Sequence, residues 1–147
     1  MITITEHICA PLLVRFVLES TLDYPSVGDV DGRLACYSHG EGCWAVAWRD
    51  RSPAGIACIT TLDNGSYQGS LCLYWLEVLP SFQRQGVGQT LLMWARAQIV
   101  DAALVIASTP QAAPFYRRHL VGWTEPTPNT LLVKGGALRE CGGRIAA

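Results

Sequence analysis

Apolar residues recur with two different periods along this chain, and the change of period separates expected strands from expected helices. Ile2 to Thr5 alternates apolar and β-branched residues, which predicts a short first strand. Pro11 to about Ser20 is an apolar stretch that begins with proline, a residue favoured in the first turn of a helix, so a helix is expected there. Cys43 to Arg49 and Gly55 to Leu62 predict two strands of a meander, joined by a turn over residues 51–54.

The second half of the chain carries the strongest patterns. Leu71 to Leu79 is an almost uninterrupted apolar run, which predicts a central strand buried on both faces and ended by Pro80. From Val87 to about Val100 apolar residues recur at helical spacing, which predicts a helix whose polar residues Arg96 and Gln98 face water. Shorter runs predict a buried strand at Ala103–Ala107, a helix at Gln111–Leu120 and a final strand at Thr130–Val133.

The order of these elements predicts an α+β fold class. Strands that begin antiparallel and then enter a strand–helix–strand unit form a mixed sheet with helices on both faces. Tyr24 to Gly42 contains Pro25 and is rich in glycine and aspartate, so we expect a loop, a short second helix and a turn there. Residues 1–147 should form a single domain, with a frayed C-terminal tail of roughly eight residues.

Composition narrows the classes of protein that remain. Half of the 147 residues are apolar, 16% are charged and the formal net charge is −1, which argues against disorder and against a basic nucleic-acid surface. The apolar run from Ile8 to Val14 is too short to span a bilayer. Six cysteines are scattered without a CxxC pair or Cys/His ligand spacing, so we expect no metal and a reduced, cytoplasmic setting.

The turn between the best strand and the best helix is the decisive stretch. Gly86 and Gly88 allow backbone angles closed to other residues, so consecutive amides from Gln85 to Thr90 can turn toward one point at the open end of the helix. With the helix dipole they form an anion site suited to a pyrophosphate, and Arg84 can add a charged contact. GxxxxGK[ST] is absent, and Leu91 replaces the third glycine of GxGxxG, which disfavours nucleoside triphosphates and NAD. The alternative is a glycine-softened turn without a ligand.

Two motifs give this stretch a family resemblance. Gln83-x-x-Gly86-x-Gly88, preceded by the strand residues 76–80, resembles the acetyl-CoA signature of the GNAT (GCN5-related N-acetyltransferase) superfamily. Residues 112–118, Ala-Ala-Pro-Phe-Tyr-Arg-Arg, followed by Gly122-Trp123, resemble that family's later motif. The resemblance covers about the C-terminal half of the chain. It implies a GNAT-like fold with a mostly antiparallel central sheet, acetyl-CoA as co-substrate, a small-molecule or peptide amine as acceptor, and a homodimer.

Carried over residue by residue, the resemblance also implies a site. The backbone of Val78 and Leu79, at a splayed or bulged strand end, would lie along the pantetheine arm, and Tyr116 would be the general acid. Glu77, a carboxylate inside an apolar strand, is the candidate base, with a water chain as the alternative. Many members carry Asn where this chain has Thr109, which leaves that cofactor contact in doubt. The implied cofactor-binding residues are Val78, Leu79, Arg84, Gln85, Gly86, Val87, Gly88, Gln89 and Thr90.

Two other functions remain open on the sequence. A protein of the same fold that binds CoA without catalysing transfer would act as a sensor or an interaction module. An unrelated α/β phosphate binder would prefer ATP or NAD to CoA. The leading interpretation is an N-acetyltransferase that transfers the acetyl group directly to a primary amine, since no cysteine lies within either motif to carry it.

Overall fold

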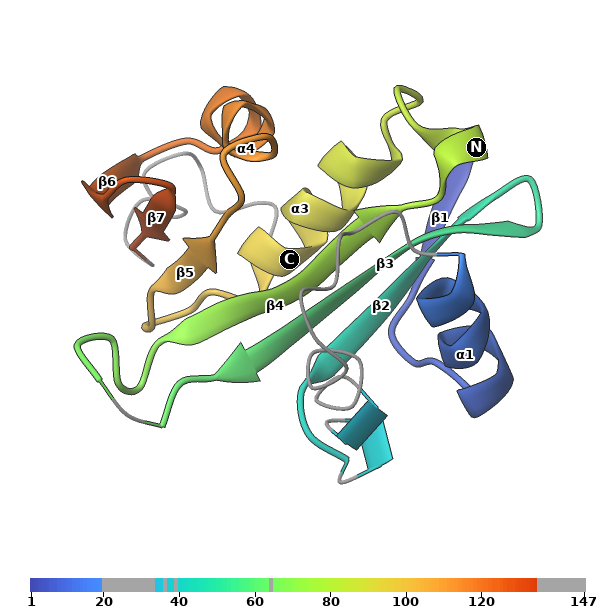
Figure 1. Cartoon of the computed structure of the whole chain (residues 1–147), viewed down its shortest axis with the longest axis horizontal. Helices are drawn as coiled ribbons and strands as arrows, with labels where there is room; N and C mark the ends of the chain where they lie inside the picture. The colour runs from blue at the N-terminus through green and yellow to red at the C-terminus, as the bar shows by residue number, and fades with distance from the viewer. Residues whose placement is uncertain (20–33, 36, 39, 64, 135–147) are drawn as a thin grey trace. The chain divides into compact units, whose positions relative to one another are not determined.

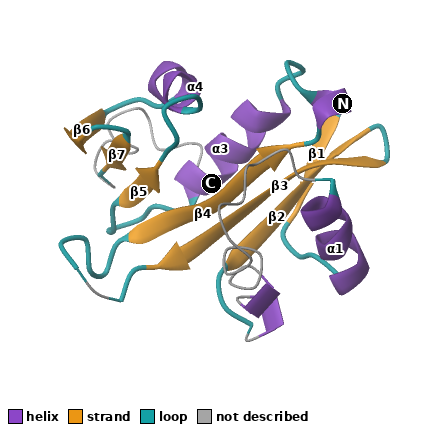
Figure 2. Ribbon diagram, viewed as in Figure 1, coloured by secondary structure: helices purple, strands orange, loops and turns teal. Residues whose placement is uncertain are grey.

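The computed structural model describes residues 1–19, 34–35, 37–38, 40–63 and 65–134 of the chain. Its strands form one seven-stranded mixed sheet in the order β1-β2-β3-β4-β5-β7-β6 (Figures 1 and 2). Internal contacts divide the chain into two units, and we describe each by itself. The first comprises Met1–Cys58 with Trp75–Leu91, and the second Ile59–Tyr74 with Leu92–Ala147.

The elements follow the predicted order. The strands are β1 (Ile2–Thr5), β2 (Cys43–Arg49), β3 (Ser52–Thr61), β4 (Leu71–Val78), β5 (Leu104–Ala107), β6 (Trp123–Thr127) and β7 (Thr130–Val133). The helices are α1 (Ala10–Leu18), α3 (Val87–Ala97) and α4 (Ala113–His119), with a 3-10 turn η1 at Pro80–Phe82. The mixed sheet with its helices confirms the α+β fold class.

One face of the first unit carries an apolar cluster under α1. The helix contributes Leu13 and Phe16, each 1% exposed, because these residues lie three positions apart and share one face. They pack with side chains from three strands and the residue after β4: Trp44, Val46, Ile56, Cys58, Trp75 and Leu79. Beside this cluster β1 pairs antiparallel with β2, from Ile2 opposite Arg49 to Thr5 opposite Val46.

The opposite face of β3 receives the start of α3. Successive residues of a strand point to opposite faces, so Gly55 points away from the face that Ile56 shares with α1. A Cβ atom on Gly55 would lie 2.9 Å from Cδ1 of Leu91 and 3.0 Å from Cγ1 of Val87. The first unit therefore has helices on both faces of its strands, as the sequence predicted.

The second unit joins one parallel pair of strands to an antiparallel hairpin. The parallel ladder between β4 and β5 pairs Leu71 with Leu104 and Cys72 with Val105. β5 then pairs antiparallel with β7, and β7 with β6, whose register shifts between Thr124 and Thr127. Sequence analysis did not single out β6 as a strand, because its five residues WTEPT include a proline and little apolar character.

The start of β3 differs from the prediction. The strand begins at Ser52 and includes Pro53, because the chain reverses at Asp50 and Arg51, whose φ angles are 48° and 71°. Two left-handed residues in succession are typical of the two-residue hairpin turn that matches strand twist. The expected turn over residues 51–54 was wrong because such turns usually carry Asn or Gly, and neither is present at these two positions.

Two burial predictions were also wrong. β4 is buried on only one face, since Leu73, Trp75 and Glu77 are buried while Tyr74 between them is 38% exposed. Arg96 does not face water but is 5% exposed, and its Nε and Nη2 atoms have no hydrogen-bond partner among the described residues. In the region Tyr24–Gly42, where a loop, a short second helix and a turn were expected, residues 34–35 and 37–38 are helical. Residues 24–33, 36 and 39 of that region, and the predicted frayed tail, lie outside the described residues.

Candidate active site

The turn between β4 and α3 bends the backbone at alternating positions. Arg84 has a φ of 62° and Gly86 a φ of 85°, both in the left-handed region. Glycine adopts this conformation without steric cost, while an arginine pays for it, so the surrounding turn must impose it. Left-handed residues alternating with other conformations make consecutive N–H groups converge on one point, which is the arrangement of anion-binding nests. The turn is thus shaped to present main-chain donors.

The donors themselves lie at the open end of α3. Within the described part of the chain, the amides of residues 85–89 donate to no main-chain oxygen, whereas Thr90 N–H donates to the Gly86 carbonyl at 3.0 Å. The Thr90 hydroxyl donates to the same carbonyl at 2.8 Å and fixes the first turn. Unpaired amides at the positive end of a helix dipole attract an anion, and the Arg84 side chain is exposed on the same turn.

Two glutamine side chains tie the turn to the strand before it. Gln83 Nε2 donates to the Val78 carbonyl at 3.2 Å, and Gln85 Nε2 donates to the Ser81 carbonyl at 3.1 Å. Leu79 is also engaged, because its N–H donates to the Ala54 carbonyl at 2.8 Å and its carbonyl accepts from Phe82 N–H at 2.9 Å. A ligand amide bonding to Val78 would therefore share that carbonyl with Gln83 or displace the exposed glutamine.

Gly55 sets how closely the start of α3 approaches the strands. A Cβ at this position would lie 2.9 Å from the main-chain oxygen of Glu77, closer than real Cβ contacts allow. The same glycine thus touches the strand that carries the candidate base and the helix that carries the anion site. Gly55 was not predicted as a site residue, although a glycine inside a strand is a known sign of close backbone approach.

Glu77 is buried and oriented by a neighbour on its own strand. Its side chain is 5% exposed, and Trp75 Nε1 donates to Glu77 Oε1 at 3.0 Å. Trp75, 2% exposed, is held in turn by an edge-to-face contact with Trp44 at 6.4 Å between ring centroids. Trp75 was not among the predicted site residues. Residues 75 and 77 share a face of the strand, which is the signal that could have revealed the pair.

Tyr116 lies in α4, in the second unit. It is 7% exposed, and this burial raises the pKa of Tyr116 to about 12, because a phenolate is poorly solvated inside the protein. Its ring contacts that of Phe115 edge-on at 5.3 Å between centroids. The phenol is therefore protonated at neutral pH and can donate a hydrogen bond.

Thr109 is engaged at the approach to α4. Its hydroxyl accepts from Ala112 N–H at 3.2 Å, and its carbonyl accepts from Ala113 N–H at 3.0 Å. These bonds satisfy two of the amides that a helix start leaves unpaired. The threonine side chain thus has a local role at the position where many family members carry Asn.

The predicted residues fall into two groups. Glu77, Val78, Leu79 and the turn from Arg84 to Thr90 all belong to the first unit, whereas Tyr116 belongs to the second. A separate open cavity of about 460 Å³ in the first unit is lined by Thr3, Thr5, Trp48 and three neighbours, and it includes none of the predicted site residues.

Among the described residues, no three His, Cys, Asp or Glu side chains gather as a metal site would require. No helix in the described ranges is both long and apolar enough to cross a membrane.

Comparison with solved structures identifies the fold. An acetyltransferase from Brucella melitensis in complex with acetyl-CoA superimposes with a TM-score of 0.68 at 19% identity, covering 91% of this chain and 88% of that one. The N-acetyltransferase YlbP from Bacillus subtilis in complex with CoA gives 0.65 at 14% identity, covering 91% and 97%. The N-acetyltransferase YhbS from Escherichia coli, also with CoA, gives 0.66 at 14% identity, covering 90% and 81%. These identities are low, so the likeness shows the fold.

The family is shown by the sequence itself. A search of the curated proteins returns no match. The model of the acetyltransferase (GNAT) domain, however, matches residues 40–119, more than half of the chain. This range includes the motif from Gln83 to Gly88 and residues 112–118 of the later motif, and it ends with α4 at His119. The chain therefore belongs to the GNAT acetyltransferase family.

Proposed function

We propose that this chain is an N-acetyltransferase that transfers an acetyl group from acetyl-CoA directly to a primary amine. The observation that carries the proposal is the open end of α3, where left-handed residues and unpaired amides form an anion site. The related structures from Brucella melitensis and Bacillus subtilis hold acetyl-CoA and CoA, respectively. An acyl carrier that contains a pyrophosphate matches both the anion site at α3 and the cofactors bound in those structures.

In this proposal the cofactor follows β4 into the turn. The pyrophosphate oxygens accept hydrogen bonds from the amides of Gln85 to Gln89, and the Arg84 guanidinium adds a charged contact. The Thr90 N–H, which the sequence also predicted as a donor, is already bonded to the Gly86 carbonyl. The pantetheine arm runs beside the backbone of Val78 and Leu79, and it is bound at Val78 as an added strand would be. The N–H and carbonyl of Leu79 are already paired with Ala54 and Phe82, so Leu79 contacts the arm without hydrogen bonds. Because the Val78 carbonyl already accepts from Gln83, the arm would exchange one hydrogen bond for another at that point.

The proposed chemistry needs a base, a donor for the oxyanion and an acid. Glu77 removes a proton from the attacking ammonium, directly or through a water, and the free amine nitrogen forms a bond to the thioester carbonyl carbon. A main-chain amide near Val78 stabilises the oxyanion that develops. The carbon–sulfur bond then breaks, and the sulfur leaves with a proton donated by Tyr116. The nitrogen gives its second proton to the Tyr116 phenolate, directly or through a water, which leaves the neutral amide product and restores the phenol.

The pKa of Tyr116, about 12, defines how it would assist. A phenol with so high a pKa is fully protonated at pH 7, and it donates a hydrogen bond to sulfur before it gives up its proton. Stabilisation of the departing thiolate and proton donation would thus be coupled in one step. The proposal also includes a small-molecule or peptide amine as acceptor and a homodimer, as the family resemblance implies. It includes a cytoplasmic setting and no nucleic acid, as the composition indicates.

Calorimetric titration with acetyl-CoA, ATP and NAD tests the anion site. We expect the wild type to bind acetyl-CoA alone. Gly86→Asp should lose at least about tenfold in affinity relative to Gly86→Asn, because the two variants differ only in charge and both residues tolerate a left-handed backbone. Equal affinity in the two variants, or no binding by the folded wild type, would contradict the proposal.

Tyr116→Phe separates the enzyme from a CoA-binding sensor. Thiol release is measured with spermidine, kanamycin, lysine and a peptide with a free N-terminus as probe amines. We expect Tyr116→Phe to lower kcat by roughly 10²-fold while acetyl-CoA affinity is retained. A wild type that binds acetyl-CoA but acetylates none of these amines would favour the sensor.

A further inference from the structure

α4 is too short to hold its own position. It has seven residues, Ala113–His119, and no side chain of its N-cap residue Ala112 bonds to its first turn. Isolated helices of this length are unstable in water, so the orientation of α4 is set by what it contacts. The place of the Tyr116 hydroxyl therefore depends on the contacts that hold the helix.

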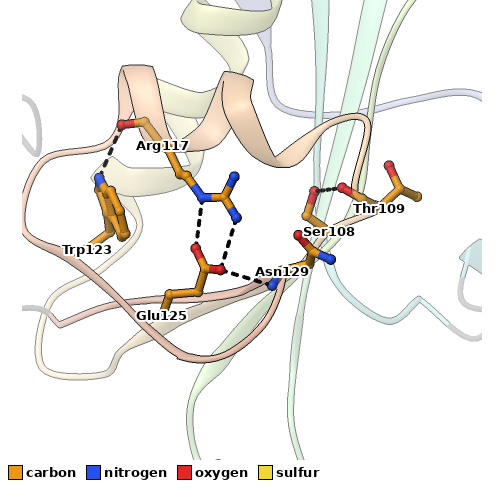
Figure 3. Close-up of polar contacts among 6 residues, drawn as sticks. All are labelled: Ser108, Thr109, Arg117, Trp123, Glu125 and Asn129. Atoms are coloured by element: carbon orange, nitrogen blue, oxygen red, sulfur yellow. Dashed lines mark hydrogen bonds and ion pairs between the residues drawn. The ribbon is translucent and has the colours of Figure 1, made fainter.

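The residue after Tyr116 makes the strongest polar contact of α4. Arg117 Nε and Nη2 donate to the two carboxylate oxygens of Glu125 on β6 at 2.8 and 2.9 Å (Figure 3). This bidentate geometry is the favoured one for a guanidinium and a carboxylate. The contact holds the pKa of Glu125 below its usual value and raises the pKa of Arg117.

Glu125 is itself fixed by the turn of the β6–β7 hairpin. Its Oε2 atom accepts from the Asn129 N–H at 3.2 Å, and Asn129 has a φ of 64° in that turn. The Asn129 carbonyl accepts from Ser108 N–H at 2.8 Å, just after β5. The carboxylate is thus held by both the helix and the turn, so it cannot follow the arginine to another position without breaking the hairpin contact.

A second bond reaches the main chain of the same helical residue. Trp123 Nε1, at the start of β6, donates to the Arg117 carbonyl at 3.1 Å (Figure 3). This carbonyl lies in the last turn of α4, where main-chain acceptors lack partners within the helix. Arg117 is therefore held at its side chain and at its backbone, one residue away from the phenol.

We propose that Arg117 and Glu125 are positioning residues, which clamp α4 to the β6–β7 hairpin and so place the Tyr116 hydroxyl for transfer. The catalytic part of this inference rests on the proposed function, and the placement of Tyr116 does not. Neither residue contacts the reacting atoms. The pair is partly exposed, and such a pair contributes little to stability, so its main effect should appear at Tyr116.

Titration of the Tyr116 phenol tests placement without any acceptor. Tyrosinate absorbance is followed in the wild type and in Glu125→Gln, and the same variants carrying Tyr116→Phe supply the signal of the other tyrosines. We expect the pKa of Tyr116 to fall from about 12 toward 10 in Glu125→Gln, because a released helix exposes the phenol to water. Arg15→Gln is the matched control, since it removes an exposed arginine–glutamate pair from α1.

Kinetics with the best probe amine test the consequence for transfer. We expect Glu125→Gln to lower kcat about tenfold, as a small misplacement of a catalytic group does, with acetyl-CoA affinity within about twofold of the wild type. Arg117→Lys keeps the charge but loses the bidentate guanidinium contact, so its kcat should lie between that of the wild type and that of Glu125→Gln. Arg15→Gln should match the wild type.

An unchanged phenol titration in folded Glu125→Gln would overturn the inference. If that variant does not fold, Arg117→Lys gives the same decision. Failure of the wild type to bind acetyl-CoA would remove the proposed function, and the titration would still decide whether the clamp places Tyr116. A shifted titration with unchanged kcat would show that the clamp places the side chain but does not serve transfer.

Discussion

Gly55 shows how one missing side chain can serve two functional elements. Any larger residue would press on the Glu77 carbonyl and on Leu91 at 2.9 Å. The backbone oxygen cannot move without shifting β4, and the helix cannot retreat without moving the anion site. The absence of a Cβ is therefore what brings the two into contact.

Gly55→Ala should destabilise the protein by about 1–3 kcal/mol, as overpacking of a dense core does. Chemical denaturation measures the change in free energy of unfolding. Leu91→Ala and the double variant complete a cycle, in which removal of the Leu91 contact should recover part of the loss in Gly55→Ala. Strict additivity would mean that the crowding is not at Leu91. Acetyl-CoA affinity should also fall in Gly55→Ala, because the start of α3 is displaced.

The sequence singled out some of the residues described above and missed others. Glu77 stands out as a charge in an apolar strand, and the structure finds it buried. Its partner Trp75 was missed because tryptophan in a core needs no other explanation. Arg96 was placed in water by its charge, but it is buried in the last turn of α3. Helical periodicity predicts which face of a helix is apolar overall. It does not predict whether one long polar side chain, such as that of Arg96, is buried.

At the scale of elements, strand and helix ranges were predicted to within a few residues where the apolar pattern was long. The errors lie at turns and short strands. The Asp50–Arg51 turn lacks the usual glycine, and β6 lacks a clear alternation. The contact of α4 with the β6–β7 hairpin joins residues eight positions apart across a turn, which no local pattern indicates.

The clamp should make stability depend on pH on the acid side. The pKa of Glu125 is lowered in the folded protein by Arg117, so the unfolded chain binds a proton first as pH falls. The stabilisation is fully present above the ordinary value of 4.5 and is lost as pH falls through the lowered value. Denaturation midpoints of the wild type and Glu125→Gln should therefore differ at neutral pH and converge at low pH. A constant difference would contradict this assignment.

At the scale of the whole molecule, the order of elements and the family were predicted and are confirmed, while the single domain stays a prediction. The boundaries between the two units fall inside β3, β4 and α3, so the chain crosses between them within continuous elements. Much of the region from Tyr24 to Gly42 lies outside the described residues. The acceptor was unpredictable because the sequence of this region has no periodic pattern from which a binding pocket could be inferred.

Thermal unfolding tests the single domain and the ligand together. We expect one transition, since separate unfolding of the units would have to break three continuous elements. Acetyl-CoA at about one hundred times its Kd should stabilise the fold by ~2.7 kcal/mol, a shift of several degrees in Tm. Gly86→Asp, with an affinity at least about tenfold lower, should reduce this stabilisation at the same ligand concentration to about 1.4 kcal/mol or less. Two resolved transitions would contradict the single-domain prediction.

A substitution in the turn between β2 and β3 can show whether this hairpin forms before or after the rate-limiting step of folding. Asp50 and Arg51 both hold left-handed backbone angles without glycine, so the turn is costly to close. Arg51→Gly removes part of that cost without touching the site. If refolding accelerates while unfolding keeps its rate, the hairpin is already formed at the rate-limiting barrier; if only unfolding slows, it closes afterwards.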